Sequence, residues 1–205
     1  MPARMARNKI LQDGCYAHVF SKSIEKRRIF QDAQDFQTFR ESLLAVKAEY
    51  LFRIHHYCFM NTHFHLAVSI PSLDRFSVGL QRLKWSYTQY YNRRYQRKGP
   101  LWHERFKSLL IENDRYLYAC GLYIEQNPVK AGLVAQSDDW AYTSASFYQK
   151  GRKDELLDGY EVPSLPDEID RSDDIVFTRG AGIGTKIFKI YLKEATADRK
   201  MPVPF

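Results

Sequence analysis

The spacing of hydrophobic residues changes several times before residue 130, and this change constrains the fold more than any other feature of the sequence. Alternating apolar residues, as at 16–22 (YAHVFSK), are typical of a strand with one buried face, whereas spacings of three and four are typical of a helix. In order, the pattern predicts a strand at 16–22, a helix at 32–50, strands at 52–60 and 63–70, a helix from about 80 to 97, a strand at 106–111 and a helix from 113 or 114 to about 126.

Turn-forming residues separate these elements. Asn61 and Thr62 form a tight turn between the second and third strands. Gly99 and Pro100 end the second helix, and Pro128 disfavours helical geometry at the residue before it. The order strand-helix-strand-strand-helix-strand predicts an α+β protein with a ferredoxin-like sandwich, in which helices pack on one face of an antiparallel sheet. One more helix follows the sandwich.

The chain is long enough for one buried domain and an appendage. Its 205 residues, 44% of them hydrophobic, are typical of a folded protein. We expect the domain to span residues 1–149. Residues 150–205 are predicted to be an acidic linker and a small C-terminal extension with a helix at about 185–195.

Targeting signals and cysteine spacing bear on where the protein works. No run of about 18 apolar residues is present, so no transmembrane helix is expected, and the basic N-terminus lacks the apolar core of a secretory signal. Cys15, Cys58 and Cys120 show no CxxC spacing. These features predict a reduced, cytoplasmic protein without a membrane partner.

The net charge of +7 is unevenly distributed. Residues 82–107 carry many basic side chains and one acid, Glu104, whereas the charged residues at 154–174 are nine acids and Arg171. A basic region of this kind suits a polyanion such as nucleic acid, and it equally suits a solvated surface.

The tripeptide His63-Phe64-His65 lies in a predicted strand. Side chains alternate along a strand, so both histidines point to one face, and two imidazoles on a rigid strand suit a divalent ion. A pair of half-exposed strand histidines would show the same pattern. A zinc site built from the nearby His55, His56 and Cys58 is a further reading.

The predicted helix before Pro128 carries Tyr123 and Asn127 four residues apart, on one helical face. A tyrosine phenol can form a covalent phosphodiester, and an amide oxygen can bind a hard cation. Tyr116, seven residues earlier, shares the face and is the alternative nucleophile.

Five ordered segments resemble one protein family. The sequence is similar to the REP-associated tyrosine transposases, relatives of the small single-tyrosine insertion-sequence transposases of the HUH class. The matching segments are 16–21 (YAHVFS), 57–66 (YCFMNTHFHL), 87–95 (YTQYYNRRY), 99–108 (GPLWHERFKS) and 123–134 (YIEQNPVKAGLV). Two segments depart from the family pattern, namely Asn61-Thr62 where Pro-Asn is common and residues 142–144 (YTS) where Trp-Ser-Ser is usual.

The resemblance implies a transposase that cleaves and rejoins single-stranded DNA beside a palindromic hairpin of the repetitive extragenic kind. It implies Tyr123 as the nucleophile that forms a 5′-phosphotyrosine, and His63, His65 and Asn127 as ligands of Mg²⁺ or Mn²⁺. A domesticated relative that binds the hairpin without chemistry is the alternative, and a zinc-stabilised nucleic-acid-binding domain is a third. Whether the protein is a monomer or a homodimer stays open.

The basic region supplies the candidate DNA contacts. We expect phosphate contacts from five side chains, Arg93, Arg94, Arg97, Arg105 and Lys107. Aromatic residues interleave with these cations at 85–98, where they either stack on bases or pack in the core, and Trp102 has the same two readings.

Overall fold

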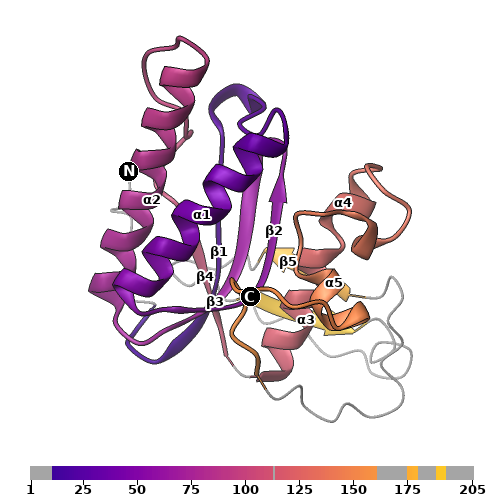
Figure 1. Ribbon diagram of the computed structural model, residues 1–205. Helices are drawn as coiled ribbons and strands as arrows, with labels where there is room; N and C mark the ends of the chain where they lie inside the picture. Colours follow the sequence, from indigo (N-terminus) through magenta and orange to yellow (C-terminus); the bar gives the residue numbers. More distant parts are fainter. Residues whose placement is uncertain (1–10, 113, 161–174, 180–187, 193–205) are drawn as a thin grey trace.

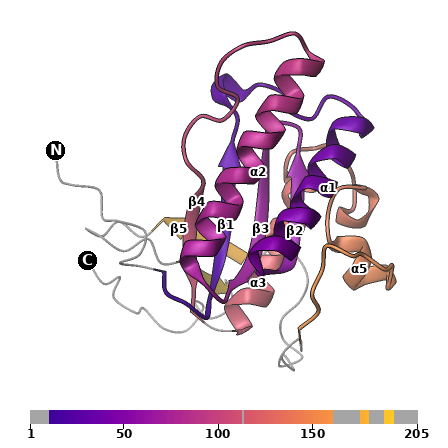
Figure 2. The same cartoon turned by 60° about the vertical axis from the view of Figure 1, so that its left-hand side comes forward.

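The computed structural model describes residues 11–112, 114–160, 175–179 and 188–192 (Figure 1). Its centre is an antiparallel sheet in the spatial order β2-β3-β1-β4, formed by β1 (Cys15–Lys22), β2 (Arg53–Met60), β3 (His63–Ile70) and β4 (Lys107–Ile111). Helices α1 (Ala33–Tyr50) and α2 (Leu73–Arg94) lie side by side on one face, and α3 (Asp114–Glu125) packs on the other (Figure 2). The predicted α+β sandwich with an added helix is confirmed.

Helix α2 begins earlier and ends earlier than the predicted helix at 80–97. It starts at Leu73, whose amide donates a hydrogen bond to Asp13 Oδ1 at 2.8 Å. It ends at Arg94, and Gln96 beyond it adopts a left-handed φ of 49°, which a right-handed helix cannot continue.

Alternation along the strands places two different clusters on the two faces of the sheet. On the side of α1 and α2, Ala17 and Val19 of β1 and Phe64 and Leu66 of β3 join a large core rich in aromatic side chains. On the side of α3, a smaller cluster contains Ala67, which contributes little volume above the sheet. The small residue leaves room for α3 to approach, and His63 and His65 point to this side.

The outer edge of β2 is covered by later parts of the chain. The amide of Phe59 donates to Tyr142 O at 2.9 Å, and the amide of Asp158 donates to Ile54 O at 2.8 Å. Covered strand edges cannot pair with another chain. The short helices α4 (Asn127–Lys130) and α5 (Ala145–Lys150) and the 3₁₀ turns η2 (Ile24–Lys26) and η3 (Ser137–Asp139) complete the main domain.

The structure describes only the first part of the predicted acidic linker at 150–174, and residues 161–174 lie outside the described residues. Residues 152–160, which we call the strap, are packed on the domain and are not loose. Arg40 Nη2 of α1 lies 2.6 Å from Asp154 Oδ1, and Lys47 Nζ lies 2.8 Å from Asp158 Oδ2. Leu156 is completely buried. Two of the three acidic residues of the strap, Asp154 and Asp158, therefore pair with basic residues of α1. The domain boundary at residue 149 stays a prediction.

The predicted helix at about 185–195 is wrong where the structure describes it. Strands β5 (Ile175–Arg179) and β6 (Phe188–Leu192) pair in an antiparallel two-stranded sheet. Residues 188–192 (FKIYL) alternate Phe188, Ile190 and Leu192 with Lys189 and Tyr191, a period of two that suits a strand. The rest of that prediction lies outside the described residues. Among the helices described, none has the length and apolar character needed to cross a membrane.

Candidate functional site

Strand β3 brings His63 and His65 together on the α3 side of the sheet, as their spacing predicts. Their ring centroids are 5.0 Å apart. His65 is 6% exposed, whereas His63 is only partly buried at the start of the strand. The pair therefore has one ring in the interior and one near the hairpin turn.

Helix α3 places the ring of Tyr123 beside the buried histidine. The ring centroids of Tyr123 and His65 are 6.3 Å apart, with the planes nearly perpendicular. Tyr123 and the alternative nucleophile, Tyr116, both pack against the smaller cluster. The phenol of Tyr123 and the two imidazoles thus converge on one side of the sheet from elements distant in sequence.

The smaller cluster and a buried polar network hold α3 in this position. Leu117, Cys120 and Ile124 pack on the sheet around Ala67. Glu125, at the end of α3, accepts a hydrogen bond from His56 Nδ1 of β2 at 2.8 Å. A carboxylate and an imidazole buried together fix the helix in one register, because both would lose their partner if α3 slid.

Two further contacts extend this network. Ser144 Oγ donates to Glu125 Oε1 at 2.6 Å, and His56 Nε2 lies 2.8 Å from Tyr160 OH of the strap. Tyr148 stacks on the imidazole of His56 with centroids 4.5 Å apart. We call His56, Glu125, Ser144 and Tyr160 the α3 latch.

His18 of β1 also lies at the site, although it is not among the residues predicted from the sequence. Its Nε2 lies 2.9 Å from His65 Nδ1, and its ring centroid lies 6.1 Å from that of Tyr123. Alternation in 16–22 places His18 on a face with Phe20 and Lys22, which was visible in the sequence. Only the pairing of β1 with β3 brings this face beside His65.

Burial keeps these imidazoles neutral. Desolvation lowers the pKa of His18 to about 3, and desolvation together with the charge of Lys22 lowers the pKa of His63 to about 4. The pKa of His65 lies well below its usual value because of burial and then because of the neighbouring His18, His63 and Lys22. Neutral imidazole is the form that binds a metal ion.

Asn127 lies one turn after Tyr123, at the junction of α3 and α4. Its Nδ2 donates to the carbonyl oxygens of Tyr123 and Ile124, at 3.0 Å each. The amide nitrogen is therefore used at the helix end and the amide oxygen faces away from those carbonyls. No hydrogen bond within the described part of the chain joins Asn127 to His63 or His65.

The donor set is compatible with a divalent ion shared with a substrate. Within residues 11–112 and 114–160, no group of three or more His, Cys, Asp or Glu side chains could hold a metal ion by itself. Two neutral imidazoles and an amide oxygen leave coordination positions for water or phosphate oxygens. A closed structural metal site does not fit this set.

The hypothesis of a zinc site formed by His55, His56 and Cys58 is not supported by their contacts. Both ring nitrogens of His55 have hydrogen-bond partners, Asp158 O and Ser69 Oγ. The nitrogens of His56 are used in the α3 latch, and Cys58 is buried in the smaller cluster. These residues hold the strap and α3 instead.

The five predicted DNA contacts differ in how their charges are used. Arg94 pairs with Asp32 and with the buried Asp35, at 2.6 Å each. Lys107 Nζ lies 2.6 Å from Glu104. Arg97 is half-buried over the ring of Tyr91, whereas Arg93 and Arg105 are exposed. The geometry therefore gives Arg94 a role inside the fold and leaves Arg93 and Arg105 accessible.

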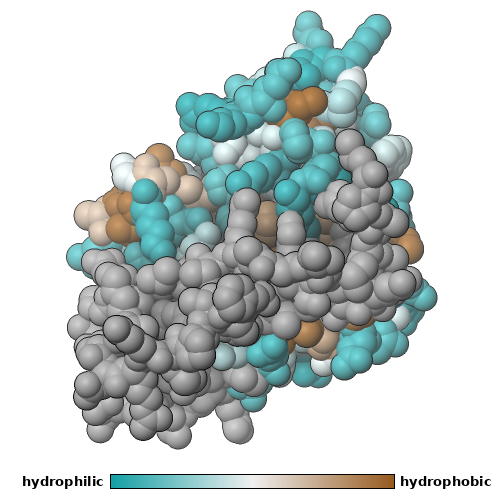
Figure 3. Space-filling view, turned by 180° about the vertical axis from the view of Figure 1, so that it is seen from behind, coloured by the Kyte–Doolittle hydropathy of each residue, from teal (hydrophilic) through white to brown (hydrophobic). Residues whose placement is uncertain are grey.

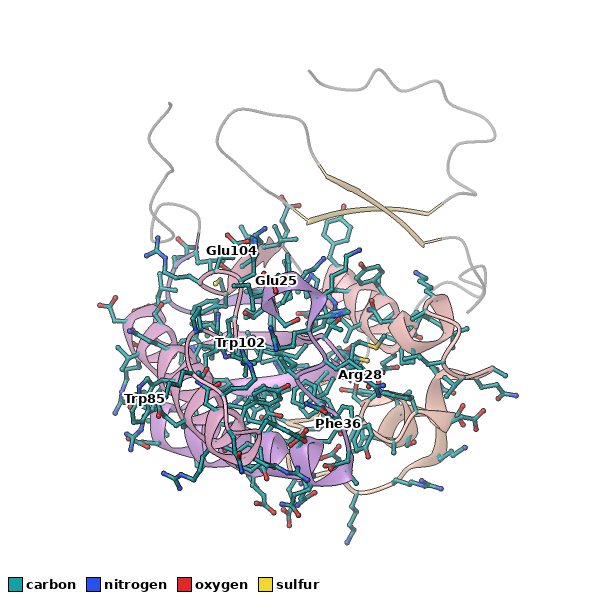
Figure 4. The ribbon with its side chains drawn as sticks, turned by 90° about the horizontal axis from the view of Figure 1, so that it is seen from above. Glu25, Arg28, Phe36, Trp85, Trp102 and Glu104 are labelled. Atoms are coloured by element: carbon teal, nitrogen blue, oxygen red, sulfur yellow. The ribbon has the colours of Figure 1, made fainter. Side chains whose placement is uncertain are left out.

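The aromatic residues at 85–98 are mostly structural. Tyr87 and Tyr91 are buried, and Trp102 is 9% exposed, with its Nε1 donating to Lys84 O. Figure 4 shows Trp102 inside the molecule and Trp85, which is 64% exposed, pointing away from it.

Basic side chains from the β1–α1 connection join those of α2 at one end of the molecule. Lys22, paired across the sheet with His63, is exposed, as are Lys26 and Arg28. The hydroxyl of Tyr91 donates to Arg28 O at 2.9 Å, which ties this connection to the end of α2. In Figure 3 this upper end of the molecule is covered mainly by hydrophilic residues.

Comparisons with known proteins agree with this arrangement. Residues 11–127 match the family described as IS200-like transposases. Over 116 residues the chain is 30% identical to a REP-associated tyrosine transposase of Haemophilus influenzae, a match that covers 52% of this chain. It spans 66% of the length of that relative.

A solved structure, described as a REP-associated tyrosine transposase bound to a REP hairpin, shares the fold. It superposes with a TM-score of 0.62 at 20% identity, over 78% of this chain and 96% of that one. At this level of identity the likeness concerns the arrangement of the elements.

Proposed function

The chain belongs to the family of IS200-like transposases, which its residues 11–127 match, and we propose that it cuts single-stranded DNA beside a hairpin and joins the strands again. Tyr123 is the nucleophile in this proposal. His63, His65 and Asn127 are the residues that would hold Mg²⁺ or Mn²⁺. The observation that carries the proposal is the position of the Tyr123 ring, 6.3 Å from that of His65 and on the same side of the sheet as His63.

The proposed reaction is a transesterification. The phenol oxygen of Tyr123 attacks the phosphorus atom, the bond from phosphorus to the 3′ oxygen breaks, and a 5′-phosphotyrosine forms. The phenol proton passes to solvent, and the departing 3′ oxygen takes up a proton to become a hydroxyl. Attack by another 3′ hydroxyl reverses the step, so strands are joined without a nucleotide cofactor.

The chain provides positive charge near the ring of Tyr123 and near His63. The ammonium of Lys130 lies 4.8 Å from the centroid of the Tyr123 ring, and Lys22 is exposed beside His63. A bound divalent ion would add charge that polarises a non-bridging oxygen of the phosphate. The phosphate would therefore be held between cationic groups while the phenol attacks.

Hairpin DNA would lie across the basic end of the molecule. Five exposed side chains, Lys22, Lys26, Arg28, Arg93 and Arg105, are suited to phosphate contacts there. We leave Arg94 out of this set because Asp32 and Asp35 already pair with its guanidinium.

The experiment that tests the function follows a covalent adduct. The full chain is incubated with Mn²⁺ and a labelled hairpin oligonucleotide that carries a single-stranded flank, and denaturing electrophoresis detects labelled protein. The wild type is expected to give an adduct, and Tyr123→Phe is expected to give none, because the phenol oxygen forms the bond.

Tyr116→Phe is the matched control, since it removes a hydroxyl from the same helix, and it should retain the adduct. Hairpin binding by the wild type without any adduct would contradict the proposal and indicate a non-catalytic binding protein. An adduct that persists in Tyr123→Phe would show that Tyr123 is not the nucleophile.

A further inference from the structure

Both histidines of the proposed ion site are held at the same ring atom. His63 Nδ1 lies 2.9 Å from Thr62 Oγ1, and His65 Nδ1 lies 2.9 Å from His18 Nε2. No hydrogen bond to the Nε2 atom of His63 or of His65 comes from any residue that the structure describes. One nitrogen of each ring is thus bound within the protein and the other is left for a ligand.

This arrangement selects one tautomer when an ion binds. An imidazole that coordinates through Nε2 keeps its proton on Nδ1, and that proton needs an acceptor. The hydroxyl oxygen of Thr62 can accept from His63. The unprotonated Nε2 of His18 can accept from His65, provided that His18 carries its own proton on Nδ1.

His18 is well suited to fix the orientation of a neighbouring ring. It is 3% exposed, and its imidazole lies beside that of His65 with centroids 5.1 Å apart and an angle of 22° between the planes. The ring of Phe20 lies 5.2 Å away on the same face of β1. A side chain packed in this way cannot turn its Nε2 away without displacing its neighbours.

We propose that His18 is a positioning residue, which accepts the Nδ1 proton of His65 and thereby presents His65 Nε2 to the divalent ion. Thr62 accepts the Nδ1 proton of His63 in the same way and presents His63 Nε2 to the ion. The inference rests on the proposed function, because it assigns a support to the ion site of that function. Its test measures ion binding without DNA, so it can fail while strand cleavage by Tyr123 stands.

The measurement is the dissociation constant for Mn²⁺, obtained from the electron paramagnetic resonance signal of unbound Mn²⁺ in titrations of the full chain. The signal of the doubly substituted His63→Ala, His65→Ala protein defines binding outside the site. His18→Leu is expected to weaken binding about 10- to 100-fold, the range typical of a lost support for a metal ligand. His18→Gln should bind within a few fold of the wild type, because its amide oxygen can accept the same proton.

Phe20→Leu is the matched control. Phe20 contacts the ring of His65 at 5.7 Å between centroids but offers no acceptor, so its substitution should leave the Mn²⁺ dissociation constant almost unchanged. Thr62→Ser and Thr62→Val form a second pair in a partly exposed turn, which stays informative if His18→Leu does not fold. The valine variant should weaken binding and the serine variant should not.

Nitrogen chemical shifts provide a readout that packing alone would not change. In the wild type, the signals of His65 should show the proton on Nδ1, and this tautomer should be lost in His18→Leu and kept in His18→Gln. Equal weakening by leucine and glutamine would overturn the inference in favour of packing. Unchanged Mn²⁺ binding in folded His18→Leu and Thr62→Val would overturn the inference altogether. If the wild type and the His63→Ala, His65→Ala protein bound Mn²⁺ equally, the ion site of the proposed function would be refuted instead.

Discussion

At the scale of single residues, burial decides the charge of the histidines near Tyr123. The pKa of His18 is lowered to about 3 by desolvation, and the pKa of His65 is lowered well below its usual range by the same cause. In an unfolded chain both groups titrate near 6.5. The folded protein therefore binds these protons only at a more acidic pH than the unfolded chain does.

We expect the free energy of unfolding to fall as the pH is lowered from about 6.5, down to the folded pKa of about 3 for His18. The unfolded chain takes up the protons first, and each buried histidine contributes a slope of about 1.4 kcal/mol per pH unit. Urea unfolding between pH 7 and pH 5, with a chelator present, measures this slope. A free energy that stays constant over the window would contradict the burial of neutral histidines.

Arg94 and Arg93 are neighbours that differ in their ion-pair partners. Arg94 and the hydroxyls of Tyr90 and Tyr95 bind the completely buried carboxylate of Asp35, at 2.6 to 2.9 Å. Arg93 is exposed, and no ion pair joins it to another residue in the described ranges. The sequence shows two adjacent arginines in a basic helix, and only packing against α1 distinguishes them.

The two arginines should separate stability from DNA binding. Arg94→Gln is expected to lower the midpoint of thermal unfolding and to leave the salt dependence of hairpin binding unchanged. Arg93→Gln should leave the midpoint unchanged and reduce the slope of log Kobs against log salt by about one. Titrations of both variants at several salt concentrations check this, and a reduced slope in Arg94→Gln alone would reverse the assignment.

At the scale of elements, the position of α3 on the sheet depends on its close approach to β2. A methyl group placed at Gly121 would overlap the imidazole of His56, which the α3 latch already holds from both ring nitrogens. The glycine therefore lets the helix lie directly on the ring. In an open part of a helix, alanine would instead be favoured over glycine by about 1 kcal/mol.

Gly121→Ala should therefore destabilise the protein by about 1–3 kcal/mol, the usual cost of overpacking, and should slow adduct formation because α3 carries Tyr123. Urea unfolding and the rate of adduct formation measure the two effects. Gly159→Ala is the control, since a methyl group there meets no atom within 4 Å. A stabilised Gly121→Ala protein would show that α3 does not lie on His56.

The spacing of hydrophobic residues along the chain was sufficient to predict the order of strands and helices in the sandwich, although not the bounds of α2. It also placed His63 and His65 on one face of β3, and the resemblance pointed to Tyr123. The approach of His18 could not be read in the same way, because it depends on the alignment of β1 with β3, in which Phe20 faces His65. Such a register is a property of two distant segments.

At the scale of the whole molecule, the strap belongs to the folded unit. Leu156 is completely buried against the main core, and Asp154 accepts a hydrogen bond from Tyr57 of β2 at 2.5 Å. The acidic composition of this segment predicts a linker, whereas Asp154 and Asp158 find partners on α1 and β2. Composition records charge but not the location of the opposite charge, which is why that prediction fails for residues 152–160.

Leu156→Ala in the full chain should lower the free energy of unfolding by about 2–5 kcal/mol, as expected for a large side chain removed from a core. Leu157→Ala, at a half-buried neighbour, should cost less. Urea midpoints of the two variants provide the comparison. Equal and small effects would mean that the strap detaches from the domain in solution.

The hydrogen bond between Tyr160 and His56 sets a lower limit on how far the chain can be shortened. The match to the transposase family stops at residue 127, yet Ser144 and Tyr160, which complete the α3 latch at the end of the helix that carries Tyr123, come later in the chain. A graft of residues 11–127 alone into another protein would carry Tyr123 without the hydrogen bonds from Ser144 and Tyr160. Engineered or naturally shortened versions should preserve the chain through residue 160 if cleavage is to survive.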